Sequence, residues 1–221
     1  MTGELTLPAL GARRNLREEI TRTLRAAVIS GELRPGVVYS APNLAGQFGV
    51  SATPVREAML DLANEDLVEI VRNKGFRVTE LSEKDLDELS ELRALIEVPT
   101  VRRIASAGVP ESALDELRGL AAEIEAAAAR GDLIAHVTAD MEFHLTLLSL
   151  AGNRHLVETV RSLRARSRIY GLRSLADRGA LVPSAHEHAE LLDLLAAGSV
   201  DAAEELMRAH TGHVRGIWAE S

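Results

Sequence analysis

The chain has 221 residues, enough for one large or two small domains, and its 46% hydrophobic and 26% charged residues are usual for a soluble globular protein. An aromatic content of only 3% argues against a base-stacking platform for single-stranded nucleic acid, and the absence of cysteine excludes disulfides and thiolate zinc sites. No signal peptide and no apolar run of membrane-spanning length is evident, so we expect a cytoplasmic protein.

The net charge of −8 is unevenly distributed along the chain. Residues 1–80 contain ten Lys/Arg and ten Asp/Glu, whereas residues 81–221 contain fifteen and twenty-three. The acidity therefore does not argue against DNA contact by the first part, although that contact must depend on a few well-placed basic residues. Short elements broken by Pro and Gly precede residues 79–82 and long periodic segments follow, which predicts two domains, 1–80 and 81–221.

The first domain begins with two predicted helices. An apolar residue recurs every four positions in the first of them, which marks an amphipathic helix that ends at Gly31: Leu16, Ile20, Leu24 and Val28. Ser40 is a suitable N-cap for the second helix, with Pro42 in its first turn and Gly49 at its end.

A third helix and a hairpin complete this domain. The helix is predicted to start at Thr53-Pro54, and its apolar face comprises Val55, Ala58, Met59 and Leu62. Two β-prone runs, 68–71 and 76–79, flank the turn 72–75, which predicts a two-stranded hairpin.

Three helices followed by a hairpin is the order of a winged helix-turn-helix, in which the third helix enters the major groove and the hairpin contacts the DNA backbone. Arg56 and Thr53 lie on the outer flank of the third helix, and Arg72 and Lys74 lie at the hairpin tip. Any one of these side chains could equally be an ordinary solvated group. The full set of predicted DNA-binding residues is Arg56, Thr53, Ser51, Asn43, Arg72, Lys74 and Gly75.

The segments 29–36 (ISGELRPG), 49–58 (GVSATPVREA) and 75–78 (GFRV) closely resemble the GntR family of repressors, and the resemblance covers residues 14–80. It implies binding to double-stranded operator DNA. Two positions depart from the family pattern: Ala52 stands where Arg is usual, and Ala41-Pro42 replaces a pair that often includes a charged residue. We therefore expect an altered operator sequence or weaker binding.

The second part is predicted to be an all-α antiparallel bundle. Periodicity and helix breakers place six helices, at 83–107, 110–130, 132–151, 153–176, 184–197 and 199–219.

Ionisable residues lie on apolar faces of three of these helices. Asp140 and His144 are spaced i and i+4 on a face shared with Val137, Met141 and Leu148, and His188 and His210 lie in similar apolar stripes. Buried charge is costly, so these groups should pair with one another or bind a cation. One carboxylate and three imidazoles suit a divalent ion, zinc in the first place, with nickel and manganese as alternatives. The competing interpretation is a set of hydrogen-bonded core histidines.

The segment 140–144 (DMEFH), together with 152–153, 187–188 and 207–210, resembles the FCD ligand-binding domain that accompanies the FadR-like subgroup of GntR regulators. The resemblance covers residues 83–216. It implies that Asp140, His144, His188 and His210 are metal ligands and that the protein is a homodimer. Because Asp140 would be the only charged ligand, a divalent ion would keep a net positive charge, and an open coordination position could accept a small carboxylate effector.

Arg93 lies between Leu89 and Ile96 on the apolar stripe of helix 83–107. Relatives often carry Arg here, so Arg93 is a candidate effector-binding residue, and an internal salt bridge is the alternative. The arginines at 161, 164, 166 and 168 are too closely spaced to be assigned to one face.

We therefore expect a DNA-binding transcriptional repressor whose operator affinity is controlled by an organic acid bound near a metal ion. A metal-dependent enzyme is the rival function, but no further carboxylate is convincingly placed as a general base. Glu142, the nearest candidate, lies about a hundred degrees from Asp140 around its helix. A purely structural metal ion is a third possibility.

Overall fold

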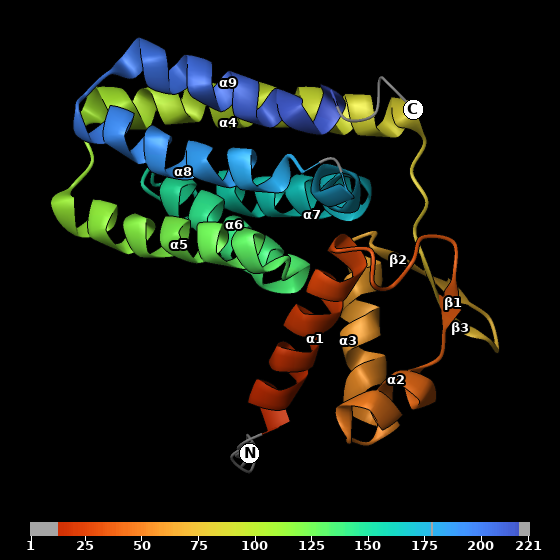
Figure 1. Cartoon of the computed structure of the whole chain (residues 1–221). Helices are drawn as coiled ribbons and strands as arrows, with labels where there is room; N and C mark the ends of the chain where they lie inside the picture. Colours follow the sequence, from red (N-terminus) through yellow and green to blue (C-terminus); the bar gives the residue numbers. More distant parts are fainter. Residues whose placement is uncertain (1–12, 178, 217–221) are drawn as a thin grey trace, which may run out of the picture.

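The computed structural model describes residues 13–177 and 179–216, and the fold over these ranges is mainly helical (Figure 1). The N-terminal part contains three helices and three short strands: α1 (Arg13–Ile29), β1 (Val38–Tyr39), α2 (Ala41–Phe48), α3 (Ala52–Asn64), β2 (Val68–Val71) and β3 (Gly75–Val78). This is the predicted winged helix-turn-helix, with β2 and β3 as the wing.

Local polar and glycine signals set the ends of α2. Ser40 Oγ accepts a hydrogen bond from the backbone N–H of Asn43 at 3.3 Å, and Pro42 lies in the first turn, where its missing N–H leaves no hydrogen bond unmade. Gly49 ends the helix in the left-handed conformation, at φ 66°. These three predicted roles are confirmed.

Helices α1 and α3 pack together through their apolar faces. The four residues predicted on the apolar face of α3 are buried: Val55, Ala58, Met59 and Leu62. On α1, Ile20, Leu24 and Val28 are buried as expected, but Leu16 is 40% exposed. The periodic pattern therefore predicts the helix correctly, but the burial that it predicts for Leu16 in the first turn is wrong.

The sheet has a strand that the sequence analysis did not predict. Its order is β1-β3-β2, and all pairs are antiparallel. Strand β1 is only two residues long, too short for an alternating pattern, and it pairs Val38 with Arg77 and Tyr39 with Phe76. β3 begins at Gly75, one residue earlier than predicted. A Cβ atom at Gly75 would lie 2.2 Å from the carbonyl oxygen of Tyr39, so glycine lets β1 approach.

The C-terminal part is the predicted helical bundle. Within the described ranges it consists of α4 (Glu83–Ala107), α5 (Glu111–Arg130), α6 (Leu133–Ser149), α7 (Arg154–Asp177), α8 (Leu181–Ala196) and α9 (Val200–Gly216). Helix α8 begins three residues before its predicted start because Pro183 is accommodated in its first turn. The predicted end of the last helix, at 219, lies outside the described residues. No helix in the described ranges is both long and apolar enough to span a membrane.

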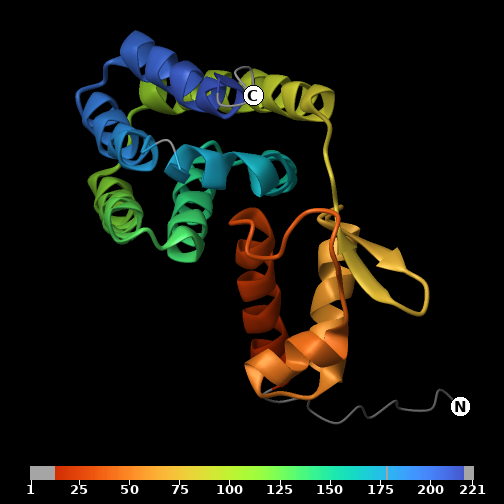
Figure 2. The same cartoon turned by 45° about the vertical axis from the view of Figure 1, so that its right-hand side comes forward.

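The bundle is layered, and the winged helix-turn-helix contacts one side of it. Helix α4 packs along α9 and against α7, while α5 packs against α6 and α8 (Figure 1). Helix α1 reaches α6 and α7, so the two parts of the chain share a contact (Figure 2).

Helix α6 is covered on more than one side. Asp140 and His144 point into the bundle as predicted, and the apolar face continues around the helix to Val137 and Met141. These last two residues line a cleft toward α1, because a central helix can bury apolar residues against two neighbours at once.

Candidate metal centre and nucleic-acid interface

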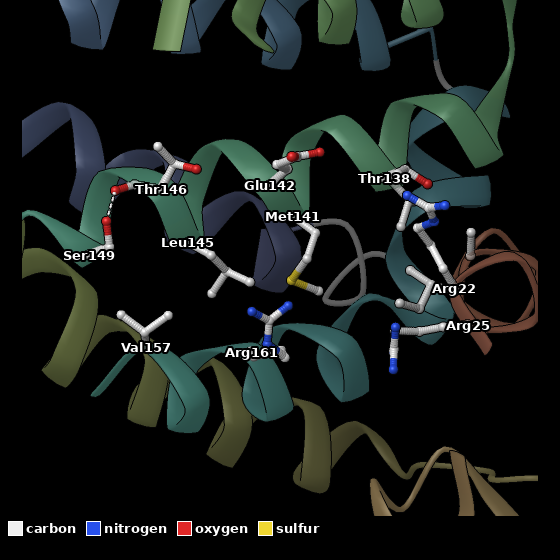
Figure 3. Close-up of a pocket in the computed structure, with 13 residues that line it drawn as sticks. Arg22, Arg25, Thr138, Met141, Glu142, Leu145, Thr146, Ser149, Val157 and Arg161 are labelled. Atoms are coloured by element: carbon white, nitrogen blue, oxygen red, sulfur yellow. Dashed lines mark hydrogen bonds between the residues drawn. The ribbon is translucent and has the colours of Figure 1, made fainter. Parts of the chain in front are cut away.

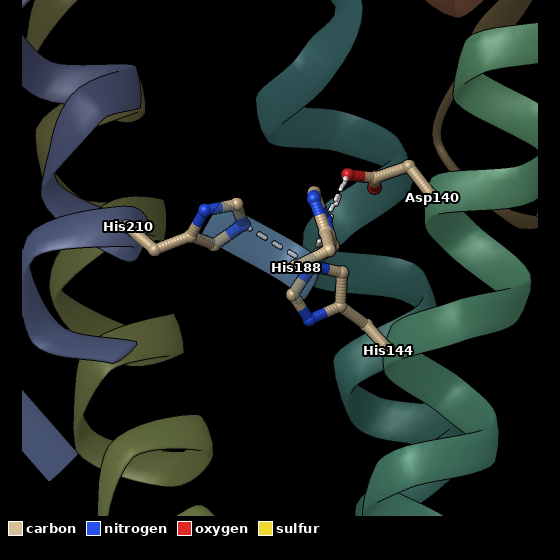
Figure 4. A group of neighbouring side chains, drawn as sticks. All are labelled: Asp140, His144, His188 and His210. Atoms are coloured by element: carbon tan, nitrogen blue, oxygen red, sulfur yellow. Dashed lines mark hydrogen bonds and ion pairs between the residues drawn. The ribbon is translucent and has the colours of Figure 1, made fainter. Parts of the chain in front are cut away.

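Four ionisable side chains converge inside the bundle (Figure 4). Helix α6 supplies Asp140 and His144 one turn apart, α8 supplies His188, and α9 supplies His210. One ligand-type atom of each residue lies within 4.8 Å of those of the other three, and all four residues are buried. The structure thus brings together the four residues that the sequence analysis singled out.

Three imidazole nitrogens and one carboxylate oxygen face a common centre. His144 Nε2 lies 3.2 Å from His188 Nε2 and 3.1 Å from His210 Nε2. Asp140 Oδ1 lies 3.3 Å from His188 Nε2 and 3.8 Å from His144 Nε2. Donors at zinc–ligand distances, placed at the corners of a tetrahedron, are about 3.4 Å apart. Both the donor set and its spacing therefore fit a divalent ion.

Hydrogen bonds outside the cluster set which ring nitrogen faces this centre. His188 Nδ1 lies 3.0 Å from the carbonyl oxygen of Ala185, and His210 Nδ1 lies 2.8 Å from Glu187 Oε2. Because both partners only accept, each Nδ1 carries the proton and each Nε2 presents a lone pair. The single Nε2 of His144 cannot donate to both lone pairs. A cation at the centre would satisfy all of them.

Burial favours the neutral form of two of these imidazoles, His144 and His210. It lowers the pKa of His144 well below its ordinary value, and the nearby Arg164 guanidinium lowers this pKa further. Burial also lowers the pKa of His210 to about 4, although the hydrogen bond that His210 donates to Glu187 acts in the opposite direction. The neutral form, which is the one that ligates metals, is therefore present at pH 7.

A buried ion network holds the remaining oxygen of Asp140. Arg164 Nη2 lies 2.9 Å from Asp140 Oδ2, and Arg164 Nη1 lies 2.7 Å from Glu97 Oε2. Burial would raise the pKa of Glu97, but Arg164 and Arg93 outweigh it and hold that pKa below its ordinary value. The network connects α4, α6 and α7.

Arg93 points into the bundle, as its position on the apolar stripe predicted. It is buried, and its Nε lies 2.7 Å from Glu97 Oε1, which is the internal salt bridge weighed as its alternative role. Its Nη1 donates to Ser167 Oγ at 3.3 Å, while Nη2 has no hydrogen-bond partner within the described part of the chain. One donor of Arg93 thus remains available to a ligand.

Three other histidines, His136, His155 and His186, lie outside the cluster. His136 is buried, with Nδ1 lying 3.3 Å from the carbonyl oxygen of Ile124. His155 and His186 are exposed. The side chain of His213 is outside what the structure describes.

The candidate DNA-binding residues of the helices lie at the surface. Thr53 and Arg56 are exposed near the start of α3, and Arg56 has no ion-pair partner among the described side chains. Ser51 is the N-cap of α3, yet its side chain makes no capping hydrogen bond. Asn43 is exposed on α2. Ala52 packs against the core of the domain, so its small side chain has a structural role.

The wing presents the remaining candidates. Arg72 and Lys74 are exposed in the turn between β2 and β3. Gly75 is only half exposed, and its close approach to the carbonyl oxygen of Tyr39 gives it a structural role, while its DNA contact stays a prediction. Arg72 and Lys74 are thus positioned to meet a phosphate backbone, whereas Gly75 shapes the wing.

Sequence reasoning missed three residues around the metal centre: Glu97, Arg164 and Glu187. Glu97 lies one turn after Arg93, and this i, i+4 spacing of opposite charges was a usable signal. Arg164 was among four clustered arginines whose inward member the sequence cannot reveal. Glu187 precedes His188 but contacts His210 on another helix, a contact that only the fold creates.

The sequence matches two family models. Residues 16–78 match the model described as bacterial regulatory proteins, gntR family, and residues 88–213 match the FCD domain. These matches coincide with the winged helix-turn-helix and the bundle.

Curated relatives and solved structures agree with these matches. The Nta operon transcriptional regulator of Aminobacter aminovorans is 34% identical over 142 residues, which cover 63% of this chain and 66% of the relative. The probable D-xylose utilization operon transcriptional repressor of Paenarthrobacter nicotinovorans is 31% identical over 186 residues, covering 83% and 80%. The structure of E. coli McbR/YncC has a TM-score of 0.78 at 24% identity, covering 93% of this chain and 98% of that one, and shows the same fold. The matched families and relatives are transcription regulators, not enzymes.

Proposed function

The chain belongs to the GntR family of bacterial regulatory proteins and carries an FCD domain, and from this membership we propose a homodimeric repressor that a small organic acid controls. It is a transcriptional regulator, as its family and relatives are. The proposal adds three elements: operator contact by α3 and the wing, dimer formation by the bundle, and an acid bound beside a divalent ion. We place the boundary between domain 1–80 and domain 81–221 in the segment between Val78 and Ser82, the N-cap of α4.

DNA contact rests on exposed basic residues. In the proposed complex, α3 lies in the major groove of double-stranded operator DNA with Arg56 facing the bases, and Arg72 and Lys74 contact phosphates. The support is that these side chains are exposed at the two places where a winged helix-turn-helix meets DNA.

Dimer formation is supported by an apolar patch on α4. Leu92 is 47% exposed and Leu95 is 65% exposed, about one turn apart on the same helix. Single exposed leucines are common on protein surfaces, but neighbouring ones on a long helix favour contact with a second copy. A dimer would present two α3 helices to the two halves of a palindromic operator.

The metal site is the single observation that carries the effector proposal. Asp140, His144, His188 and His210 would hold the ion, zinc in the first place, with nickel and manganese as alternatives. When bound, the ion would attract an anionic group electrostatically, and no bond need be broken. The four side chains that would hold the ion are buried, so the effector that the ion attracts must be small.

Charge balance supports an acid as that ligand. Arg93 and Arg164 are compensated by Glu97 and Asp140, so the buried network is neutral before any ion is added. A divalent cation would add two positive charges, of which Glu187, bound to His210, offsets one, and buried charge is costly unless it is paired. A carboxylate would supply the compensation, and the unpartnered Nη2 of Arg93 would donate to it.

The same network offers a route to the DNA-binding domain. Arg93 and Glu97 lie on α4, which follows the wing after a short linker. An acid that draws Arg93 away from Glu97 would alter the packing of α4, and in a dimer this would change the spacing of the two α3 helices.

Operator DNA obtained by in vitro selection would test the proposal. Affinity would be measured by fluorescence anisotropy on metal-loaded protein, with and without a panel of C2–C6 mono-, di- and tricarboxylates. We expect one acid to change the affinity in the wild type and in His155→Ala, and to have no effect in His188→Ala. An absence of response to every acid, or a response that survives in His188→Ala, would contradict control through the metal centre.

A further inference from the structure

A cavity separate from the metal centre lies beside another side of α6. It is a cleft with a volume of about 480 Å³, and its walls are α1, α6 and α7 (Figure 3). The cleft therefore lies between the DNA-binding domain and the bundle. Asp140 and His144 face the bundle interior, whereas Met141 and Leu145, the next residues along α6, face this cleft.

Apolar side chains from three helices form one part of the cleft wall. Ile29 of α1 and Val137, Met141 and Leu145 of α6 line it together with Val157 of α7. Its volume is within the range of cavities that hold small organic molecules. An apolar body of one or two rings would exclude water from these side chains and gain the free energy of their burial.

The rim of the cleft is basic. Arg22 and Arg25 of α1 and Arg161 of α7 line it, against one acidic residue, Glu142. Arg25 Nε lies 2.8 Å from Glu65 Oε2, and the ion-pair partner of Arg161 among the described side chains is the exposed Glu158, at 3.3 Å. Arg22 has no partner among the described side chains. Figure 3 shows Arg161 reaching from α7 toward Met141, and Arg22 reaching from α1 toward α6.

We propose that this cleft binds an amphipathic organic anion, with a single carboxylate or sulfonate at Arg161 and Arg22 and an apolar body against Met141 and Leu145. The two sites have no lining residue in common, although both are built on α6 and α7, so the cleft takes its ligand without a metal ion at the centre. Planar guanidinium groups bind carboxylates through paired hydrogen bonds, which suits them to the acid group.

Such a ligand would contact both domains. Helix α1 is joined to α3 by ion pairs, with Arg17 Nε lying 2.9 Å from Asp61 Oδ2 and Arg25 bound to Glu65. An anion held between α1 and the α6–α7 pair would therefore fix the orientation of α3 relative to the bundle. A ligand in the cleft would thus affect the orientation of α3 in addition to any effect of the metal centre.

Calorimetric titration of the full chain with 2-naphthoate, after removal of metal ions with EDTA, tests the site. We expect saturable one-to-one binding, and no saturable binding of the neutral analogue 2-naphthalenemethanol. Replacing one charged donor of a carboxylate weakens binding by roughly tenfold. Arg161→Gln should show that loss, and the double variant Arg22→Gln/Arg161→Gln should show no saturable binding.

Arg118→Gln is the matched control. Arg118 lies on α5, away from the cleft, its side chain is about as exposed as that of Arg161, and it also pairs with an acidic residue three positions earlier on its own helix. It should bind 2-naphthoate as the wild type does, and thermal melting should show that all variants are folded. Unchanged affinity in the double variant, equal binding of the neutral analogue, or binding that requires zinc would each overturn the proposal. Because the titration uses metal-free protein, its result is independent of whether the metal centre binds an acid.

Discussion

Arg164 Nη2 donates a hydrogen bond to Asp140 Oδ2 at 2.9 Å, while Asp140 Oδ1 faces the histidine cluster. The two oxygens of one carboxylate therefore serve different partners. Because Arg164 also binds Glu97 of α4, the orientation of a candidate metal ligand depends on the helix that follows the wing. Partners of this kind usually tune both ligand geometry and metal affinity.

Arg164→Met should destabilise the protein by about 3–5 kcal/mol, because it leaves Asp140 without its buried cation and Glu97 with only Arg93. Urea denaturation of metal-free protein would measure the change. Arg118→Met, at an exposed ion pair, should change the free energy of unfolding by less than about 1 kcal/mol. A similarly small effect at Arg164 would show that the buried network contributes little to folding.

Zinc affinity should fall in the same Arg164 variant even where it remains folded. Loss of a residue that orients a metal ligand typically costs about 10–100-fold in affinity. Competition with a chromophoric chelator would measure it. His155→Ala, at an exposed histidine remote from the cluster, should bind zinc as the wild type does, whereas equal affinity in wild type and Arg164→Met would remove Arg164 from the site.

Arg56→Ala should weaken operator binding by about 1–3 kcal/mol without lowering the melting temperature, because Arg56 is exposed and unpaired within the described structure. Anisotropy on the selected operator gives the affinity, and a salt titration shows whether a phosphate contact has been lost. Arg118→Ala, in the bundle, should bind DNA normally. Unchanged affinity in Arg56→Ala would place the base contacts elsewhere.

Leu92→Glu/Leu95→Glu should convert the proposed dimer to monomers, because it places two charges in the apolar patch of α4. Sedimentation velocity would measure the change. Leu150→Glu provides the control, since Leu150 is also exposed, at 37%, but lies at the end of α6. A double variant that sediments as the wild type does would exclude this patch as the dimer contact.

The features that could be predicted from the sequence are those that local chemistry determines. Ser40 and Gly49 define the ends of α2 through hydrogen bonds and backbone conformations within a few residues, and the Asp140–His144 spacing sets a common direction on one helix. His188 and His210 could be placed with them only because they too lie on apolar faces and match a known family pattern.

The features that escaped prediction depend on contacts between distant segments. Arg164 faces inward because it pairs with Glu97 and Asp140 on two other helices. The sequence around residue 164 does not indicate these partners. Met141 was assigned to the metal-facing side because a single apolar face was assumed, whereas α6 also packs toward α1. The cleft between the domains is lined by that second face of α6, so it could not be predicted from the sequence either.

Gly75 and Gly46 offer a final contrast within the DNA-binding domain. Gly75→Ala would place a Cβ 2.2 Å from the carbonyl oxygen of Tyr39, at a φ of 134° that L-residues rarely adopt. The variant should therefore lose at least about 1–2 kcal/mol of stability, the typical cost of one strained backbone conformation, and wing-dependent DNA affinity with it. Gly46→Ala meets nothing within 4 Å in the middle of α2 and should stabilise the protein by about 0.5–1 kcal/mol. Thermal and urea denaturation of the two variants would measure these opposite signs. Equal effects would mean that β1 does not hold its close position against β3, and that Gly75 is free for the DNA contact first assigned to it.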